Sequence, residues 1–118
     1  MAQHNNTGFF GEELAVGYFI RTGFEIIAKN WRYSYYEVDI IASKASVLHF
    51  IEVKTRTGKS YGLPEEKVSN KKIRNLIGAA EQYLYKHPQW KRIQFNVLSI
   101  TILPNEPVEY FFIEDVYL

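Results

Sequence analysis

The sequence contains no cysteine, only four prolines and seven glycines, and no hydrophobic run near the ~20 residues that span a bilayer. The missing cysteines exclude disulfide scaffolds, thiolate zinc sites and cysteine nucleophiles. The first seven residues are polar, unlike the apolar centre of a secretory signal peptide. These absences predict a cytoplasmic protein with no membrane-spanning segment.

The composition indicates a folded chain. Of the 118 residues, 47% are hydrophobic and 16% aromatic, and the net charge is +1, so the sequence lacks the high charge and low hydrophobicity of disordered proteins. A chain of this length buries roughly 65% of its unfolded surface, which is enough for one core. We therefore expect a single domain over residues 1–118.

Charge is distributed unevenly along the chain. Residues 54–74 hold seven bases and two acids, whereas residues 106–118 hold four acids and no base. A local basic stretch can bind a polyanion even when the average charge is near zero. The same stretch is also typical of a solvated loop and helix face, and composition alone leaves both interpretations open.

Hydrophobic periodicity predicts two helices and five strands. The first helix covers residues 7–22, with Thr7 as its N-cap and Gly23 after its end. The second begins near Ser69 and ends before Pro88. Runs rich in β-branched and aromatic residues predict strands at 24–28, 37–42, 47–55, 94–103 and 108–113. The order α-β-β-β-α-β-β predicts a mixed sheet covered by helices.

Charged residues interrupt two of the apolar strands. Glu37 and Asp39 lie two residues apart in one strand, and Glu52 and Lys54 lie two residues apart in the next. Because side chains alternate across a strand, each pair is expected to share one face of the sheet. Acids at these positions are also typical of the solvent face of a hairpin. The hydrophobic residues around them instead favour central strands covered on both sides, where buried charges need partners or a metal.

The turn between these strands sets their register. A turn centred on residues 44–45 places Glu37 opposite Glu52. It also places Asp39 opposite Phe50, which makes Asp39 and Glu52 diagonal neighbours on one face. Like charges in such positions destabilise a sheet. A cation such as Mg²⁺, which prefers oxygen ligands and needs only one or two carboxylates, would offset this repulsion.

The spacing of these residues resembles a known nuclease core. Asp39, thirteen positions before Glu52-Val53-Lys54, is similar to the PD-(D/E)XK motif. Over nearly its whole length the chain is similar to the YraN-like family of small bacterial proteins, which is itself similar to archaeal Holliday-junction resolvases. This likeness rests on Gly11-Glu12 with Ala15, Asn30-Trp31-Arg32, Glu37-Val38-Asp39-Ile40-Ile41, Phe50-Ile51-Glu52-Val53-Lys54-Thr55-Arg56, Tyr61-Gly62, Val68 with Lys72, and Ala80 with Leu84.

The resemblance implies a restriction-endonuclease-like fold in the α/β class, with an αβββαβ core, a mixed sheet flanked by helices, and here an extra C-terminal strand. It implies an endodeoxyribonuclease dependent on Mg²⁺ or Mn²⁺, acting on nucleic acid, with branched or structured DNA as a candidate substrate, and it suggests a homodimer. The chain departs from the family pattern at Tyr36, where the family usually has glycine. It departs again at residues 94–96, where Gln-Phe-Asn replaces Arg-Phe-Asp.

The resemblance also assigns roles to individual residues. Asp39 and Glu52 would bind the metal ion, and Glu12 would be a further ligand or a water-positioning group. Lys54 would orient or deprotonate the attacking water, or stabilise charge on the phosphate. Glu37 would be either a secondary ligand or a carboxylate at the rim of the site.

Basic and aromatic residues around these strands are candidates for nucleic-acid contacts. The bases placed to contact phosphates are Arg56, Lys59, Lys71, Lys72 and Arg74. The aromatic residues between positions 31 and 36 either stack on unpaired bases or pack in the core and at the sheet edge. Three function classes follow, namely a metal-dependent endonuclease, a nucleic-acid-binding module with weak or no catalysis, and a protein-interaction domain.

Overall fold

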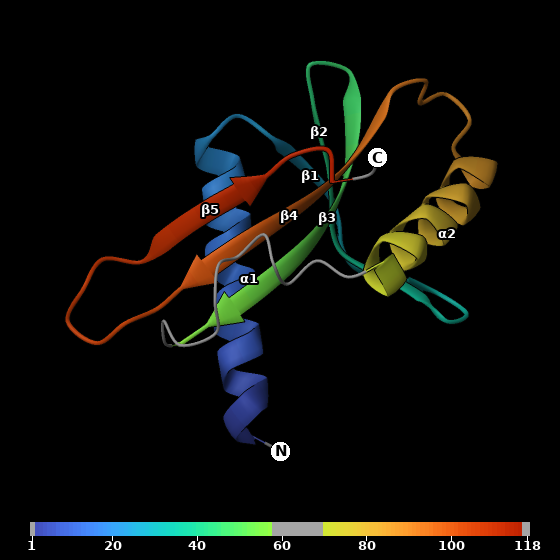
Figure 1. The fold of residues 1–118 in the computed structure, drawn as a ribbon. Helices are drawn as coiled ribbons and strands as arrows, with labels where there is room; N and C mark the ends of the chain where they lie inside the picture. Colours follow the sequence, from blue (N-terminus) through green and yellow to red (C-terminus); the bar gives the residue numbers. More distant parts are fainter. Residues whose placement is uncertain (1, 58–69, 117–118) are drawn as a thin grey trace.

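The computed structural model describes residues 2–57 and 70–116. Within these ranges the chain forms α1 (Ala2–Arg21), β1 (Glu25–Tyr33), β2 (Tyr36–Lys44), β3 (Val47–Arg56), α2 (Asn70–Lys86), β4 (Ile93–Thr101) and β5 (Glu109–Ile113) (Figure 1). The predicted order of helices and strands is confirmed. Neither helix in the described part of the chain is long and apolar enough to cross a bilayer.

The five strands form one mixed sheet in the order β1-β2-β3-β4-β5. Strands β3 and β4 are parallel, and the other neighbours are antiparallel. A parallel pair needs a crossover connection, and α2 lies within the segment that joins β3 to β4. The predicted mixed α/β sheet flanked by helices is therefore the observed fold.

Each face of the sheet has its own hydrophobic core. Phe19 of α1 packs with Ile40 and Ile51 on one face. Leu76 of α2 packs with Phe50 on the other face. Helices on both faces explain why β2 and β3 have hydrophobic residues at adjacent positions, as at Ile40-Ile41 and Phe50-Ile51, rather than only at alternate ones.

The prediction for α1 is confirmed at its C-terminal end but not at its N-terminal end. Helix α1 begins at Ala2, so Thr7 lies inside the helix, and its prediction as the N-cap was wrong. Gly23 ends the helix as predicted, with a φ of 96°. The Phe24 N–H then donates to the Phe19 carbonyl at 2.8 Å, the hydrogen bond that closes a Schellman motif.

Strand β1 is longer than the sequence predicts. It runs from Glu25 to Tyr33 rather than over residues 24–28. Polar residues in its second half hide the strand pattern. These polar residues are tolerated because β1 is an edge strand of the sheet. In the middle of β1, Asn30 adopts a left-handed backbone with a φ of 52°.

The turn between β2 and β3 lies one residue later than predicted. Ala45 and Ser46 have φ angles of 53° and 67°, as in a two-residue type I′ turn, and Lys44 pairs with Val47. Phe50 is consequently opposite Ile41. The predicted register, which set Phe50 opposite Asp39, was wrong because Ala-Ser lacks the Asn-Gly signal of such turns.

Tyr36 and Gly78 are matched across the β2–α2 contact. A Cβ atom added to Gly78 would collide with the Tyr36 ring. The glycine in α2 thus provides the space for the Tyr36 ring. Nothing in the sequence alone links these positions, which are 42 residues apart.

Gly78→Ala is expected to destabilise the protein by about 1–3 kcal/mol through overpacking, although alanine favours a helix by about 1 kcal/mol over glycine. The measurement is urea unfolding of Gly78→Ala, Tyr36→Ala and the double variant. The double variant should lose less unfolding free energy than the sum of the losses of the two single variants. Strict additivity would contradict the proposed steric match.

Candidate active site

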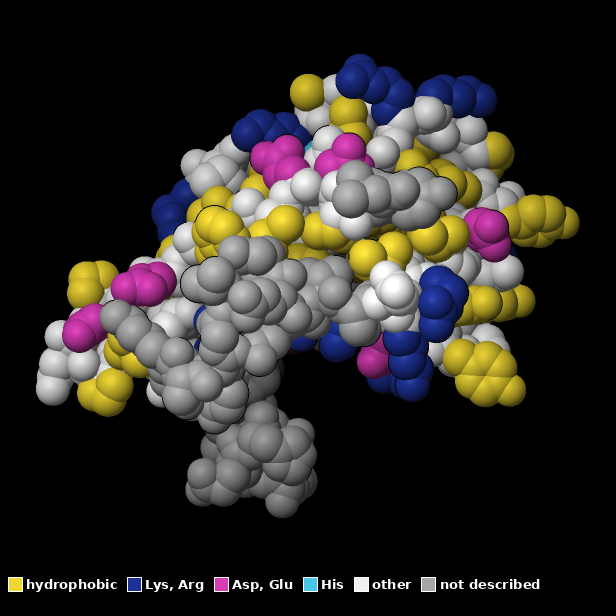
Figure 2. Space-filling view, in the orientation of Figure 1, with side chains coloured by type: hydrophobic (Ala, Val, Ile, Leu, Met, Phe, Trp, Pro, Cys, Tyr) yellow, Lys and Arg dark blue, Asp and Glu magenta, His cyan; other side chains and the backbone are white. Residues whose placement is uncertain are grey.

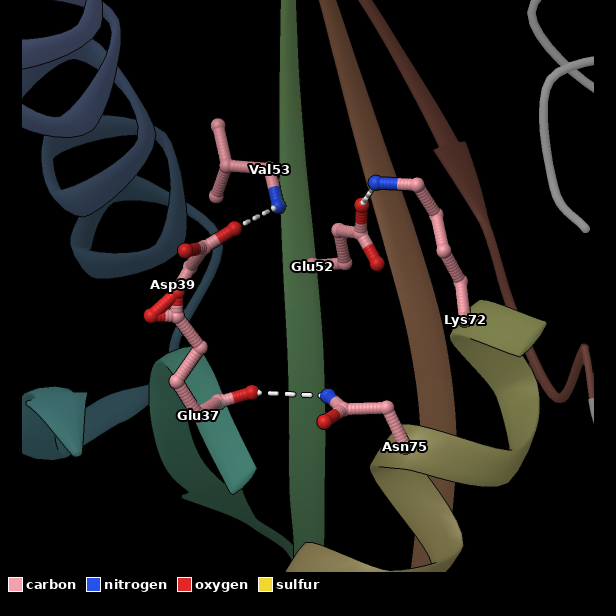
Figure 3. Close-up of polar contacts among 6 residues, drawn as sticks. All are labelled: Glu37, Asp39, Glu52, Val53, Lys72 and Asn75. Carbon is pink, nitrogen blue, oxygen red and sulfur yellow. Dashed lines mark hydrogen bonds and ion pairs between the residues drawn. The ribbon is translucent and has the colours of Figure 1, made fainter. Parts of the chain in front are cut away.

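Strand β2 separates from β3 at Asp39. The last paired residues before this point are Ile40 and Ile51. Beyond them Asp39 Oδ2 accepts a hydrogen bond of 2.7 Å from the Val53 N–H (Figure 3). The Asp39 carboxylate therefore satisfies a backbone donor of β3, and this bond fixes its position relative to the Glu52–Lys54 segment.

Strict alternation of side chains fails around Asp39. Val38 and Ile41 both pack into the core on the α2 face, although their odd spacing should place them on opposite faces of the sheet. Asn30, with its left-handed backbone, lies in the neighbouring strand between the residues that pair with Ile40 and Val38. Simple counting along β2 therefore could not predict how Asp39 lies relative to Glu52.

The environment of Asp39 favours its protonated form. Burial, the largest cause, and the negative charges of Glu52 and Glu37 raise its pKa, which is about 6 in the folded protein. The Val53 hydrogen bond and the Lys72 ammonium act in the opposite direction, but they do not offset burial. A partly buried carboxylate with a raised pKa, next to other acids, is typical of a functional site.

This pKa predicts a pH-dependent stability in the absence of metal. The folded protein binds a proton on Asp39 more tightly than the unfolded chain does. The resulting contribution of Asp39 to the unfolding free energy is complete below about pH 4 and is lost as the pH rises through about 6. In EDTA, the unfolding free energy of the wild type should fall by about 1–3 kcal/mol between pH 4 and 7.5 because of Asp39, and Asp39→Asn should not show this decrease. The measurement is the unfolding free energy at both pH values. Equal pH profiles for wild type and variant would contradict the raised pKa.

Glu52 lies on β3 and contacts α2. Its Oε2 is 2.6 Å from the Lys72 Nζ, and its side chain is only 15% exposed (Figure 3). Lys72 was predicted to contact phosphate, which stays a prediction, and the structure places its ammonium against a candidate metal ligand. Lys54 follows Glu52 by two residues in β3, so the alternation of side chains places both on the same face of the sheet. The Lys54 side chain is half-buried.

Glu37 makes two contacts outside the Asp39–Glu52 pair. Its carboxylate forms a 2.8 Å ion pair with Arg32 on β1, in which both side chains are exposed. Its backbone carbonyl accepts a 3.0 Å hydrogen bond from the Asn75 amide of α2. The sequence does not single out Asn75, because an asparagine within a helix carries no signal for a contact 38 positions away.

The predicted convergence of three carboxylates is not found. Among the residues that the structure describes, no group of three or more His, Asp or Glu side chains is arranged to hold a metal ion. Glu52 and Glu37 both act electrostatically on Asp39, but the Glu37 carboxylate forms its ion pair with Arg32. The expectation failed because it assumed the wrong register and strict alternation in β2.

Glu12 lies in the part of α1 that crosses β3. The neighbouring Gly11 is buried, and a Cβ atom at Gly11 would collide with the Thr55 side chain. The contact brings this turn of α1 to the end of β3 that also carries Lys54. Glu12 is half-buried there, and its role at the site stays a prediction.

The other predicted phosphate contacts are spread over two elements. Arg56 is half-buried at the end of β3, and Lys71 and Arg74 are exposed in the first turns of α2. Lys59 lies outside the described residues, as does the predicted cap Ser69.

A second basic region lies at the opposite end of β3. Lys44, Lys91 and Arg92 line a depression of about 630 Å³, together with Glu25 and Trp90. Lys and Arg side chains gather at the top of Figure 2, over the β2–β3 turn and the connection from α2 to β4. Sequence analysis missed this region because its bases come from segments more than 40 residues apart.

The aromatic residues of β1 and β2 divide between the core and the surface. Trp31 packs edge-on against Tyr83 of α2, with ring centroids 5.7 Å apart. Tyr35, at the tip of the β1–β2 hairpin, is 93% exposed. Trp31 is therefore part of the core, whereas stacking of the exposed Tyr35 on an unpaired base stays a prediction.

Asn96 has a structural explanation. Its fully buried amide donates to His49 Nδ1 at 2.7 Å, and its carbonyl oxygen accepts a 2.8 Å bond from the Asp115 N–H. Burial lowers the pKa of His49 and so favours the neutral ring, whose unprotonated nitrogen can accept this bond. Asn96 thus links β4 to β3 and to the C-terminal segment.

Comparison with known proteins places this geometry in a family. Residues 11–100 match the uncharacterised protein family UPF0102. The chain belongs to the UPF0102 family. The YraN-like resemblance inferred from the sequence motifs is confirmed, and Asp39, Glu52 and Lys54 all lie within the matched region.

UPF0102 relatives occur in distant bacteria. A UPF0102 protein of Rhodococcus opacus is 43% identical over 103 residues, which cover 86% of this chain and 87% of the relative. One from Clostridium perfringens is 37% identical over 120 residues, covering 99% and 98%. A third, from Flavobacterium psychrophilum, is 36% identical over 100 residues, covering 85% and 84%.

A solved structure shares the UPF0102 fold. The chain is similar to Hjc of Archaeoglobus fulgidus, a Holliday junction resolvase, with a TM-score of 0.50 and 19% sequence identity. The similarity covers 87% of this chain and 74% of Hjc. The predicted restriction-endonuclease-like fold is therefore confirmed.

Proposed function

We propose that this protein is a divalent-cation-dependent endonuclease that hydrolyses nucleic-acid phosphodiesters, with branched or structured DNA as its substrate class. The observation that carries the proposal is the Asp39 carboxylate, held by the Val53 N–H beside Glu52 where β2 and β3 separate. The fold it shares with Hjc supports the proposal, because Hjc is a Holliday junction resolvase.

The oxygen donors of the site suit Mg²⁺ or Mn²⁺. Asp39 and Glu52 supply carboxylates, and Mg²⁺ needs only one or two of these in addition to water. The raised pKa of Asp39 reflects a negative charge that burial and Glu52 disfavour, and a cation would relieve this cost. When bound, such an ion supplies Lewis-acid stabilisation of a phosphoryl oxygen and lowers the pKa of water.

The protein's own groups would orient the reaction. The Val53 N–H fixes the Asp39 carboxylate. Lys54, on the same face of β3 as Glu52, would hold or deprotonate the attacking water or stabilise charge on the phosphate. Glu12 of α1 would position water at the end of β3.

Basic groups on both sides of the site would hold the nucleic-acid backbone. Arg56, Lys71 and Arg74 would contact phosphates near the carboxylates. The depression at residues 44, 91 and 92, at the other end of β3, would extend the contact to a more distant part of a structured substrate. Such contacts provide affinity and orientation rather than sequence specificity.

The test uses end-labelled duplex, single-stranded and four-way-junction DNA, with RNA of the same sequence, in Mg²⁺, Mn²⁺ or EDTA. We expect cleavage of at least one DNA in Mg²⁺ or Mn²⁺ and none in EDTA. Protein carrying Asp39→Asn, purified in parallel, controls for contaminating nucleases. Binding without cleavage would favour a nucleic-acid-binding module that keeps the nuclease fold. The absence of both would favour a protein-interaction domain.

A further inference from the structure

Lys72 contacts the site from outside the two strands that carry the carboxylates. It lies in the first turn of α2, and its ammonium is 2.6 Å from Glu52 Oε2 (Figure 3). The Glu52 side chain is 15% exposed, whereas that of Lys72 is 47% exposed. A largely buried carboxylate is thus neutralised by a lysine that reaches it from the surface.

The same helical face also holds β2. Asn75 follows Lys72 by three residues, so both lie on one side of α2. Its amide donates to the Glu37 carbonyl, close to the point where β2 separates from β3. Helix α2 therefore contacts both strands of the site, through a charged group on β3 and through the backbone on β2 (Figure 3).

We infer that Lys72 is a positioning residue. Its ammonium pairs with the Glu52 carboxylate in the metal-free protein and moves to a substrate phosphate when a divalent cation binds to Glu52. The inference rests on the proposed function, because it assumes a cation at Asp39 and Glu52 and a phosphodiester beside them. A lysine suits this exchange, since its ammonium is a compact charge on a flexible four-carbon stem.

The exchange follows from charge. The Lys72 ammonium and a divalent cation compete for the same carboxylate and repel one another. A phosphate oxygen next to Glu52 offers the displaced ammonium a new partner with negative charge. Cation binding and nucleic-acid binding should therefore strengthen each other through Lys72, and by thermodynamic linkage the effect is reciprocal.

The first measurement is Mn²⁺ affinity without nucleic acid, followed by electron paramagnetic resonance of the free ion. We expect Lys72→Met to bind Mn²⁺ about fivefold more tightly than wild type, because it removes a competitor for Glu52. Lys71→Met is the matched control, since it removes a charge from the same turn, and should change the affinity by less than about twofold. Lys72→Arg, which can keep the ion pair, should resemble wild type.

The second measurement is affinity for labelled duplex DNA in Ca²⁺ and in EDTA. Lys72→Met should weaken binding several-fold more in Ca²⁺ than in EDTA, because a cation at Glu52 repels the Lys72 ammonium and favours its contact with phosphate. Lys71→Met should weaken binding equally in both. Thermal unfolding of each variant in EDTA verifies that it is folded.

The inference would be overturned if Lys72→Met and Lys71→Met had equal Mn²⁺ affinities, if no variant bound Mn²⁺, or if the loss of DNA affinity were the same in Ca²⁺ and EDTA. These results are separable from the proposed function. Cleavage by wild type with equal Mn²⁺ affinities would remove the role of Lys72 alone. Tighter Mn²⁺ binding by Lys72→Met without cleavage of any substrate would support Lys72 and remove the nuclease.

Discussion

Asp39→Asn and Glu52→Gln are each expected to abolish cation-dependent cleavage, with single-turnover rates reduced at least 10³-fold, in line with the loss of transition-state charge stabilisation. Each substitution keeps the size of the side chain but removes the negative charge that a cation requires. Asparagine at position 39 can still accept the Val53 N–H bond, so the strand geometry should persist. The loss would therefore report on the charge rather than on the fold.

The matched control for these carboxylate variants is Glu109→Gln, which neutralises an exposed glutamate on β5. This variant should cleave at the wild-type rate. Single-turnover cleavage at saturating protein, with circular dichroism to confirm folding, is the measurement. Wild-type rates for either Asp39→Asn or Glu52→Gln would remove the metal-site assignment.

Lys54→Ala is expected to lower single-turnover cleavage by roughly 10²-fold or more while changing affinity little. A group that positions water or stabilises charge in the transition state affects the rate more than it affects binding. The measurement compares the rate at saturating protein with the Kd for the same DNA in Ca²⁺.

Lys71→Ala serves as the control for Lys54→Ala, because it removes an exposed lysine of α2. This control should weaken binding modestly and leave the saturated rate unchanged. Equal losses of rate and affinity in Lys54→Ala would indicate that Lys54 is a phosphate contact instead.

The fold could be predicted largely from local pattern. Helical periodicity in α1 and α2, and apolar runs in β2 and β3, depend on interactions between near neighbours in the chain. Gly23 ends α1 as predicted because a left-handed residue is a local requirement. Predictions failed where the local signal was weak, as at Thr7 within α1 and in the polar second half of β1.

The sequence singles out the residues of the candidate site but not their geometry. Asp39, Glu52 and Lys54 stand out because charges within apolar strands need a physical reason. Their arrangement depends on a turn of Ala45-Ser46 and on the break in alternation around Asp39, and counting along the strands does not give either.

The sequence by itself determined the order of helices and strands, the family, and the residues that carry the candidate chemistry, because these depend on short-range periodicity and motif spacing. Only the tertiary structure decided the contacts of α2 with the site. Lys72 meets Glu52 and Asn75 meets the Glu37 backbone across 20 and 38 positions, and Gly78 makes room for Tyr36. Such contacts depend on how a helix packs on a sheet, and that packing is fixed by the whole core rather than by any segment of the chain.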